Sequence, residues 1–128
     1  MVNRRRKIMR PHRTLEAWKK AMDLVVDVYR VTDSFPKEEK FGLTSQIRRA
    51  AVSIPANIAE GAGRQSDKEF VYFLAIAQGS ASELETELLI GNRLGYIDDS
   101  NVVEYCSSLD HVGRLITGLT KHLKGRMN

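Results

Sequence analysis

The sequence contains few of the residues that crosslink or break a chain. Its 128 residues include one cysteine, three prolines and nine glycines. A lone Cys106 cannot form an internal disulfide, so a disulfide-stapled secreted fold is excluded and a reducing, cytoplasmic setting is expected. No apolar run reaches the length of a membrane span, and the basic start lacks the apolar segment of a signal peptide. We therefore expect one domain without a membrane partner.

The sequence also has little that supports catalysis or metal binding. A metal site needs several His, Cys or carboxylate groups at one point, and the three histidines lack such spacing. Cys106 has no base at helical spacing, which favours a packing role over a nucleophilic one. The Gly61-Ala62-Gly63-Arg64 stretch lacks the Gly-Lys-Ser/Thr ending of a phosphate loop. We expect no enzyme activity, no metal and no cofactor.

Charge is present but unevenly placed. The chain has 20 basic and 16 acidic residues, a net charge of +4. Six of the bases precede the first acid, Glu16, so residues 1–13 carry +6 and the remaining residues carry −2. A flexible basic arm attracts phosphate without sequence preference, although the same arm could serve only solubility. Residues 125–128 are expected to form a short tail.

Apolar residues recur at steps of three and four in four segments, which predicts an all-α fold. Thr14 is the expected N-cap of the first helix, and Pro36 closes that segment. A short turn is expected from Pro36 to Phe41. The first helix has two adjacent apolar stripes, one of Leu15, Trp18, Met22, Val25, Tyr29 and Thr32, the other of Ala17, Ala21, Leu24, Val28 and Val31.

The second segment begins near Thr44 or Ser45 and is the least polar. Between Phe41 and Gly63 only Arg48, Arg49 and Glu60 are charged. A helix that is apolar nearly all round must be covered on more than one side, so a second subunit is the expected cover. Pro55 lies inside the pattern and predicts a kink.

The third and fourth helices carry clear end signals. Ser66 with Glu69 forms a capping box, and Gly95 is the expected left-handed residue after the third helix. Asp98 to Ser100 supply the cap of the fourth helix. Because the connections are short, residues 14–124 are predicted to form an antiparallel up-down-up-down four-helix bundle.

Two sets of residues are candidates for contacts with partners. Arginine and lysine suit phosphate, whereas buried or interfacial arginines need carboxylates. Glu83 and Glu87 could be a solvated face or the partners of Arg48 and Arg49, and we favour the second. The candidate nucleic-acid-binding residues are Arg4, Arg5, Arg6, Lys7, Arg10, Arg13, Lys19, Lys20, Arg64 and Lys68. The candidate subunit-interface residues are Arg48, Arg49, Ala51, Pro55, Ala56, Asn57, Glu60, Glu83 and Glu87.

The motif Ser53-Ile54-Pro55, followed after Ala56 by Asn57-Ile58-Ala59-Glu60-Gly61, resembles a known family. With LEAWKKAMDLVVDVY before it and SDKEFVYFLAIAQGSASELETELLIGNRLGYI after it, the chain is similar to the four-helix bundle proteins encoded in intervening sequences of bacterial 23S ribosomal RNA genes. The resemblance covers about residues 12–124 and implies a homopentamer with a central channel. That family is similar in fold to the accessory variability protein of diversity-generating retroelements, a pentamer that binds nucleic acid and a reverse transcriptase.

The resemblance implies no enzymatic activity. Together with the basic arm, it leads us to expect a cytoplasmic, ring-like homo-oligomer, a pentamer, that binds RNA or DNA. The alternative is a protein-protein interaction scaffold, for example an accessory subunit of a reverse transcriptase.

Overall fold

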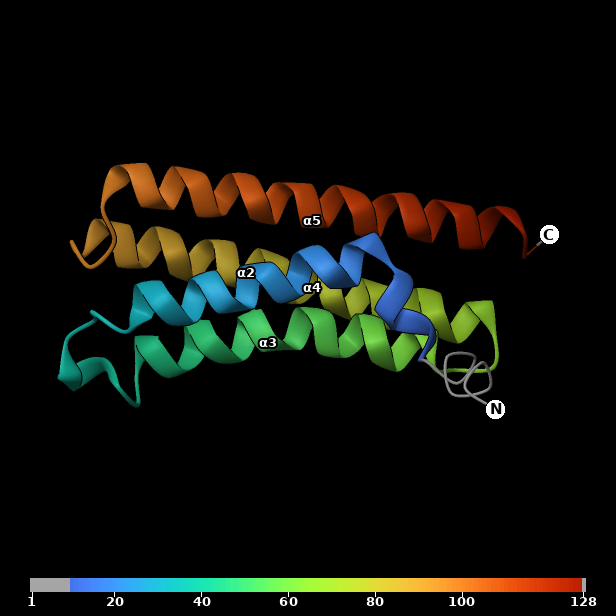
Figure 1. Ribbon diagram of the computed structural model, residues 1–128, viewed down its shortest axis with the longest axis horizontal. Helices are drawn as coiled ribbons and strands as arrows, with labels where there is room; N and C mark the ends of the chain where they lie inside the picture. The colour runs from blue at the N-terminus through green and yellow to red at the C-terminus, as the bar shows by residue number, and fades with distance from the viewer. Residues whose placement is uncertain (1–9, 128) are drawn as a thin grey trace, which may run out of the picture.

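The computed structural model describes residues 10–127, which form four long helices and two short 3-10 turns and contain no strand. In chain order the elements are η1 (Pro11–Thr14), α2 (Glu16–Thr32), η2 (Lys37–Glu39), α3 (Leu43–Ala62), α4 (Asp67–Arg93) and α5 (Asp99–Gly125). The helices alternate in direction along one long axis (Figure 1). The all-α prediction with four helices is confirmed.

The four helices pack as a closed square. Each of α2/α3, α3/α4, α4/α5 and α2/α5 is in contact, whereas the diagonal pairs make no comparable contact between the described residues. Aliphatic side chains from all four helices fill the centre, and the fully buried ones include Leu24, Ile47, Ile54, Ile58, Leu74, Leu84, Leu88, Val112 and Ile116. Within residues 10–127, no helix is both long and apolar enough to cross a membrane.

Local sequence signals set the ends of α4 and the start of α5. The Ser66 hydroxyl oxygen accepts a hydrogen bond from the Glu69 backbone N–H at 3.2 Å. Gly95 has a φ of 82°, and the Tyr96 N–H beyond it donates back to the Gly91 carbonyl at 2.9 Å. The Asp98 carboxylate accepts from the Asn101 N–H at 2.8 Å. These capping predictions are confirmed, because each depends on residues at most five apart.

The start of the first helix differs from the prediction. Leu15, and not Thr14, occupies the N-cap of α2, and it supplies no side-chain hydrogen bond. Thr14 instead belongs to η1, where its hydroxyl donates to the Pro11 carbonyl. The proline at the start of η1 sets this extra turn, which packs on both α2 and α3.

The core side of α2 is the alanine-containing stripe. Ala21, Leu24 and Val28 are buried, whereas Met22 and Tyr29 from the other stripe are about two-fifths exposed. Small side chains let neighbouring helices approach closely, so the narrower stripe fits the packed side. The bulkier stripe is covered only in part, since Trp18 and Val25 are half-buried and Thr32 is buried.

The second helix is covered mainly within its own subunit. α2 and α4 flank α3 along its length, and η1 packs on it as well. Ala51 is 1% exposed and Pro55 is also buried, so the prediction that they form a subunit interface is wrong. The outward side of α3 carries Arg49, Val52 and Ala56. The helix begins at Leu43 and continues through Pro55 to Ala62.

Candidate nucleic-acid interface

One end of the bundle gathers basic side chains from three separate parts of the sequence. The start of α2, the turn between α3 and α4, and the end of α5 all lie at the same end (Figure 1). An antiparallel bundle forces this arrangement, because every second helix end must return to the same side. We call this part of the structure, residues 10–20, 60–69 and 117–127, the basic end.

The basic end carries nine bases against four acids, whereas the rest of the described chain carries seven bases against twelve acids. Its bases are Arg10, Arg13, Lys19, Lys20, Arg64, Lys68, Lys121, Lys124 and Arg126. The described chain is therefore close to neutral as a whole but strongly divided in charge. A surface of this kind attracts a polyanion to one end.

Six of the nine are predicted nucleic-acid-binding residues that the fold brings together. Arg10 precedes η1 and Arg13 lies within it, and because η1 packs on α2 and α3, this part of the predicted arm lies against the bundle. Lys19 pairs with Glu16 at 3.7 Å on the exposed first turn of α2. The other four predicted arm residues, Arg4, Arg5, Arg6 and Lys7, lie outside the described residues.

Arg64 and its neighbours form a partly neutralised spot within the basic end. The Arg64 guanidinium lies 2.7 Å from a Glu60 oxygen and stacks over the Phe73 ring at 4.8 Å. Glu60, which we predicted at a subunit interface, is thus paired along its own helix. Exposed ion pairs are weak, so Arg64 can exchange Glu60 for a phosphate at little cost.

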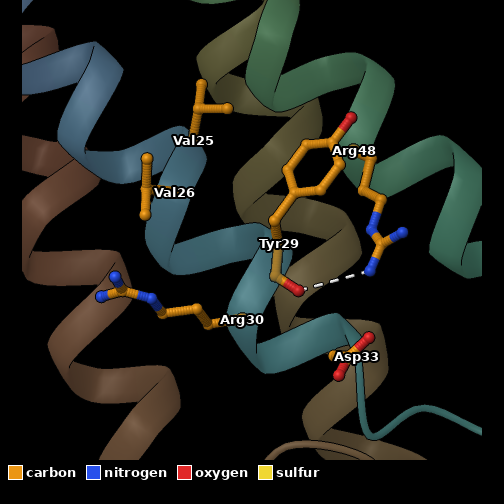
Figure 2. A pocket seen from close by; sticks show the side chains of 6 residues that line it. All are labelled: Val25, Val26, Tyr29, Arg30, Asp33 and Arg48. Atoms are coloured by element: carbon orange, nitrogen blue, oxygen red, sulfur yellow. Dashed lines mark hydrogen bonds between the residues drawn. The ribbon is translucent and has the colours of Figure 1, made fainter.

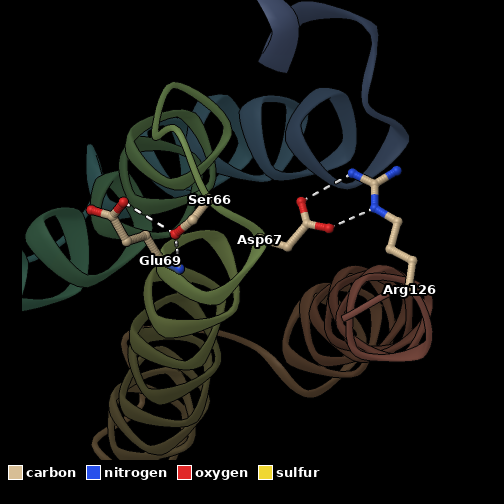
Figure 3. Close-up of polar contacts among 4 residues, drawn as sticks. All are labelled: Ser66, Asp67, Glu69 and Arg126. Carbon is tan, nitrogen blue, oxygen red and sulfur yellow. Dashed lines mark hydrogen bonds and ion pairs between the residues drawn. The ribbon is translucent and has the colours of Figure 1, made fainter. Parts of the chain in front are cut away.

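Three bases of this end were missed from the sequence. Lys121, Lys124 and Arg126 come from the last turns of α5, more than fifty residues from the turn that they approach. Arg126 binds the Asp67 carboxylate with two hydrogen bonds, of 2.7 and 3.0 Å, and so ties the end of α5 to the start of α4 (Figure 3). The hydrogen bond from Arg126 lowers the pKa of Asp67. The lengths of the helices and their antiparallel order could have predicted that these three bases lie at this end.

The predicted pairing of Arg48 with Glu83 or Glu87 does not occur within the subunit. Arg48 Nε donates to the Thr32 hydroxyl at 2.8 Å, and Nη2 donates to the Tyr29 carbonyl at 3.3 Å. Its guanidinium also lies over the Tyr29 ring, in a groove of about 570 Å³ on α2 (Figure 2). Arg49, the next residue, is exposed and takes no part in an ion pair of the described chain.

Glu87 is buried in its own subunit, which contradicts its assignment to a subunit interface. It is 7% exposed, and its Oε1 atom has no hydrogen-bond partner among residues 10–127. Burial, followed by repulsion from Glu83, raises the pKa of Glu87 from 4.5 to about 7. Glu83 itself is exposed.

A small polar seam joins α3 and α4. The hydroxyls of Ser53 and Ser80 lie 2.8 Å apart, and the Asn57 amide donates to both the carbonyl and the hydroxyl of Ser53. Asn57 therefore makes its hydrogen bonds within its own subunit, whereas the adjacent Ala56 is exposed.

No metal site or reactive thiol stands out in residues 10–127. No group of three His, Cys, Asp or Glu side chains gathers there to hold a metal ion. Burial and the nearby Glu85 raise the pKa of the Cys106 thiol, which disfavours the reactive thiolate.

Comparison with known proteins gives a consistent result. The sequence profile of the 23S rRNA-intervening sequence proteins matches residues 13–118. A crystal structure of a protein of unknown function from the S23 ribosomal protein family of Bacteroides thetaiotaomicron superposes with a TM-score of 0.74 at 26% identity. The match covers 82% of this chain and 98% of that one. No curated protein matches the chain. The profile spans most of the bundle, and the chain belongs to the family of 23S rRNA-intervening sequence proteins.

Proposed function

We propose that this protein is a non-enzymatic, cytoplasmic nucleic-acid-binding protein, which holds RNA or DNA at the basic end of its bundle. The observation that carries the proposal is the charge division: nine bases against four acids at one end, and the reverse excess elsewhere. Nearly neutral proteins with evenly mixed charges have no such directed attraction for phosphate. The sequence has four more bases, Arg4, Arg5, Arg6 and Lys7, in the residues that precede Arg10.

Binding of this kind depends on phosphate rather than on base sequence. Each lysine or arginine that neutralises a phosphate releases a condensed counterion, so affinity falls steeply as salt rises. Asp67 holds Arg126, and Glu60 holds Arg64, in exposed pairs. These two carboxylates also reduce the repulsion between neighbouring bases of the basic end before a nucleic acid binds.

We further propose that the protein assembles as a ring-like homo-oligomer, a pentamer as its family resemblance implies. Support comes from an apolar strip across the outer faces of α2 and α3, formed by Met22, Val26, Tyr29 and Val52, each at least two-fifths exposed. We call it the α2/α3 strip. Arg49 and Ala56 border it on α3, and Glu83 offers an exposed carboxylate on a different face, as a head-to-tail ring requires. Several basic ends in one particle raise avidity without new contacts.

A salt titration of RNA binding tests the proposal. The full chain is compared with a chain that begins at Thr14 and with the double variant Arg13→Ala/Lys68→Ala. The control is the double variant Lys37→Ala/Lys40→Ala, which removes two bases from the opposite end of the bundle. Relative to the full chain, we expect weaker binding and a shallower salt slope for the shortened chain and for Arg13→Ala/Lys68→Ala. The slope should fall by about one unit for each phosphate that is no longer neutralised. Equal binding and equal slopes for all four proteins would rule out the basic end as the binding surface.

A protein partner is the second candidate. Its support is the acidic remainder of the bundle, with twelve acids against seven bases, which resists phosphate but suits a basic protein such as a reverse transcriptase. Affinity capture with and without nuclease distinguishes the two functions. A partner retained after complete digestion of nucleic acid favours the scaffold, whereas loss of all partners favours direct nucleic-acid binding.

A further inference from the structure

A groove between α4 and α5 opens beside the basic end. Its volume is about 460 Å³, and its walls are Val71, Ala75 and Gln78 of α4 with Thr117, Thr120, Lys121 and Lys124 of α5. This size falls within the range of small-molecule sites. Val71 and Ala75 form an aliphatic floor on one side, and the two lysines stand on the other.

Cations surround the mouth of the groove without carboxylate partners. Lys121 and Lys124 lie one turn apart on α5, and neither takes part in an ion pair of the described chain. Lys68 lies one turn before Val71 on α4, so helical spacing places it on the same side. A ligand that carries negative charge next to a flat apolar group matches this combination of floor and cations.

A hydrogen-bonded side chain joins the two walls of the groove. The Gln78 amide nitrogen donates to the Gly113 carbonyl and to the Thr117 hydroxyl, both at 2.8 Å. These two bonds fix the orientation of the amide and join α4 to α5 along the groove, while the amide oxygen lies on the Gly113 side.

We infer that the α4/α5 groove receives an unstacked base of single-stranded nucleic acid, with its phosphates on Lys121 and Lys124. The inference rests on the proposed function and specifies the form of nucleic acid bound at the basic end. A duplex keeps its bases stacked inside, so it can use only the lysines. Single strands expose their bases, and a base that packs on the aliphatic floor of Val71 and Ala75 removes apolar surface from water.

The experiment compares a short single-stranded RNA with the same strand made abasic at its central positions, by fluorescence anisotropy. We expect the full chain to bind the base-bearing strand about three- to tenfold more tightly. Ala75→Phe fills the groove from α4, and Thr120→Phe fills it from α5. Each filled variant should bind both strands with the affinity of the abasic strand, because the lysines remain.

Ser107→Phe is the matched control. It adds the same ring to α5 but at the α2/α5 groove of about 360 Å³, which contains Asp23 and Asp27. This variant should keep the preference for the base-bearing strand. Circular dichroism verifies that each variant is folded, and either filled variant suffices for the test.

Two outcomes overturn the inference and leave phosphate binding at the basic end intact. In one, the full chain binds the two strands equally; in the other, a folded groove-filled variant keeps the preference. Failure of both strands to bind at low salt would contradict the proposed function itself.

Discussion

The Arg48 guanidinium lies 4.5 Å from the centre of the Tyr29 ring, and so joins α3 to the outer face of α2. Its hydrogen bonds to Thr32 and to the Tyr29 carbonyl fix the same side chain at two further points. Arginine suits this position because its planar group can stack and donate at once. The adjacent Arg49 has no comparable interactions, which makes the two residues a natural pair for comparison.

Arg48→Ala is expected to lower the free energy of unfolding by about 1–2 kcal/mol, because it removes a cation–π interaction and two hydrogen bonds. Arg48→Lys should recover only part of this loss. Urea denaturation gives the measurement, and Arg49→Ala is the control, with an expected change within about 0.5 kcal/mol. Equal effects at the two positions would mean that the Tyr29 interaction contributes nothing to stability.

Gly61 is required by the close approach of α3 and α4. A Cβ atom at this position would lie 2.9 Å from both Phe70 Cδ1 and Phe73 Cβ. Gly61→Ala is therefore expected to destabilise the fold by about 1–3 kcal/mol. A Cβ at Gly118 on α5 meets nothing within 4 Å, so Gly118→Ala should instead stabilise by about 0.5–1 kcal/mol. Thermal unfolding of the two variants should shift in opposite directions, and shifts of the same sign would contradict this account.

Glu87 makes stability depend on pH. Its folded pKa of about 7 lies above the ordinary value of 4.5, so between these values the folded state binds more protons than the unfolded state. The free energy of unfolding should therefore fall as pH rises from about 4.5 to about 7, by about 3 kcal/mol, and stay low above that. Urea denaturation at several pH values measures the fall.

Glu87→Gln should flatten this pH dependence and raise stability above pH 7, since glutamine is neutral at every pH. Glu83→Gln removes only the smaller cause of the raised pKa, so most of the slope should remain. If Glu87→Gln keeps the full slope of the parent protein, another group must be responsible for it.

The α2/α3 strip gives a prediction about assembly. Val52 is 42% exposed within the subunit, and Val52→Glu or Ala56→Glu would place a charge on the surface proposed for the next copy. Light scattering should show a smaller particle for both variants, because an unpaired charge disfavours a buried interface. Val103→Glu is the control, as Val103 is 67% exposed and belongs to α5, which contributes no residue to the strip. Full-size particles for all three variants would exclude the strip as an interface.

The features that could be predicted from the sequence depend on residues close together in the chain. The caps at Ser66 and Asp98 depend on residues three apart, so their patterns are visible without the fold. The family motifs around Pro55 and Gly61 identified the bundle itself. The choice between the two stripes of α2 was not visible, because both are apolar and only packing against α3 and α5 separates them.

The errors involve contacts between distant residues. Arg48 pairs with Tyr29 and Thr32, and not with Glu83 or Glu87, because α2 lies closer to its guanidinium than the acidic part of α4 does. Ala51 proved to be a core residue, because α2 and α4 already enclose that side of α3. The contribution of Lys121 and Lys124 to the basic end could have been found by counting about 1.5 Å per residue along the antiparallel helices.

The charge division makes each subunit an electric dipole along the bundle axis. In a ring whose bundles stand parallel to its axis, rotation carries the basic end of every copy to the same level, so the dipoles add instead of cancelling. Every subunit would then contribute bases to one rim of the proposed ring, which attracts phosphate, while the opposite rim, with Asp98, Asp99 and Glu104 at the start of α5, would repel it. A nucleic acid would meet a particle with two unlike sides and dock on only one of them.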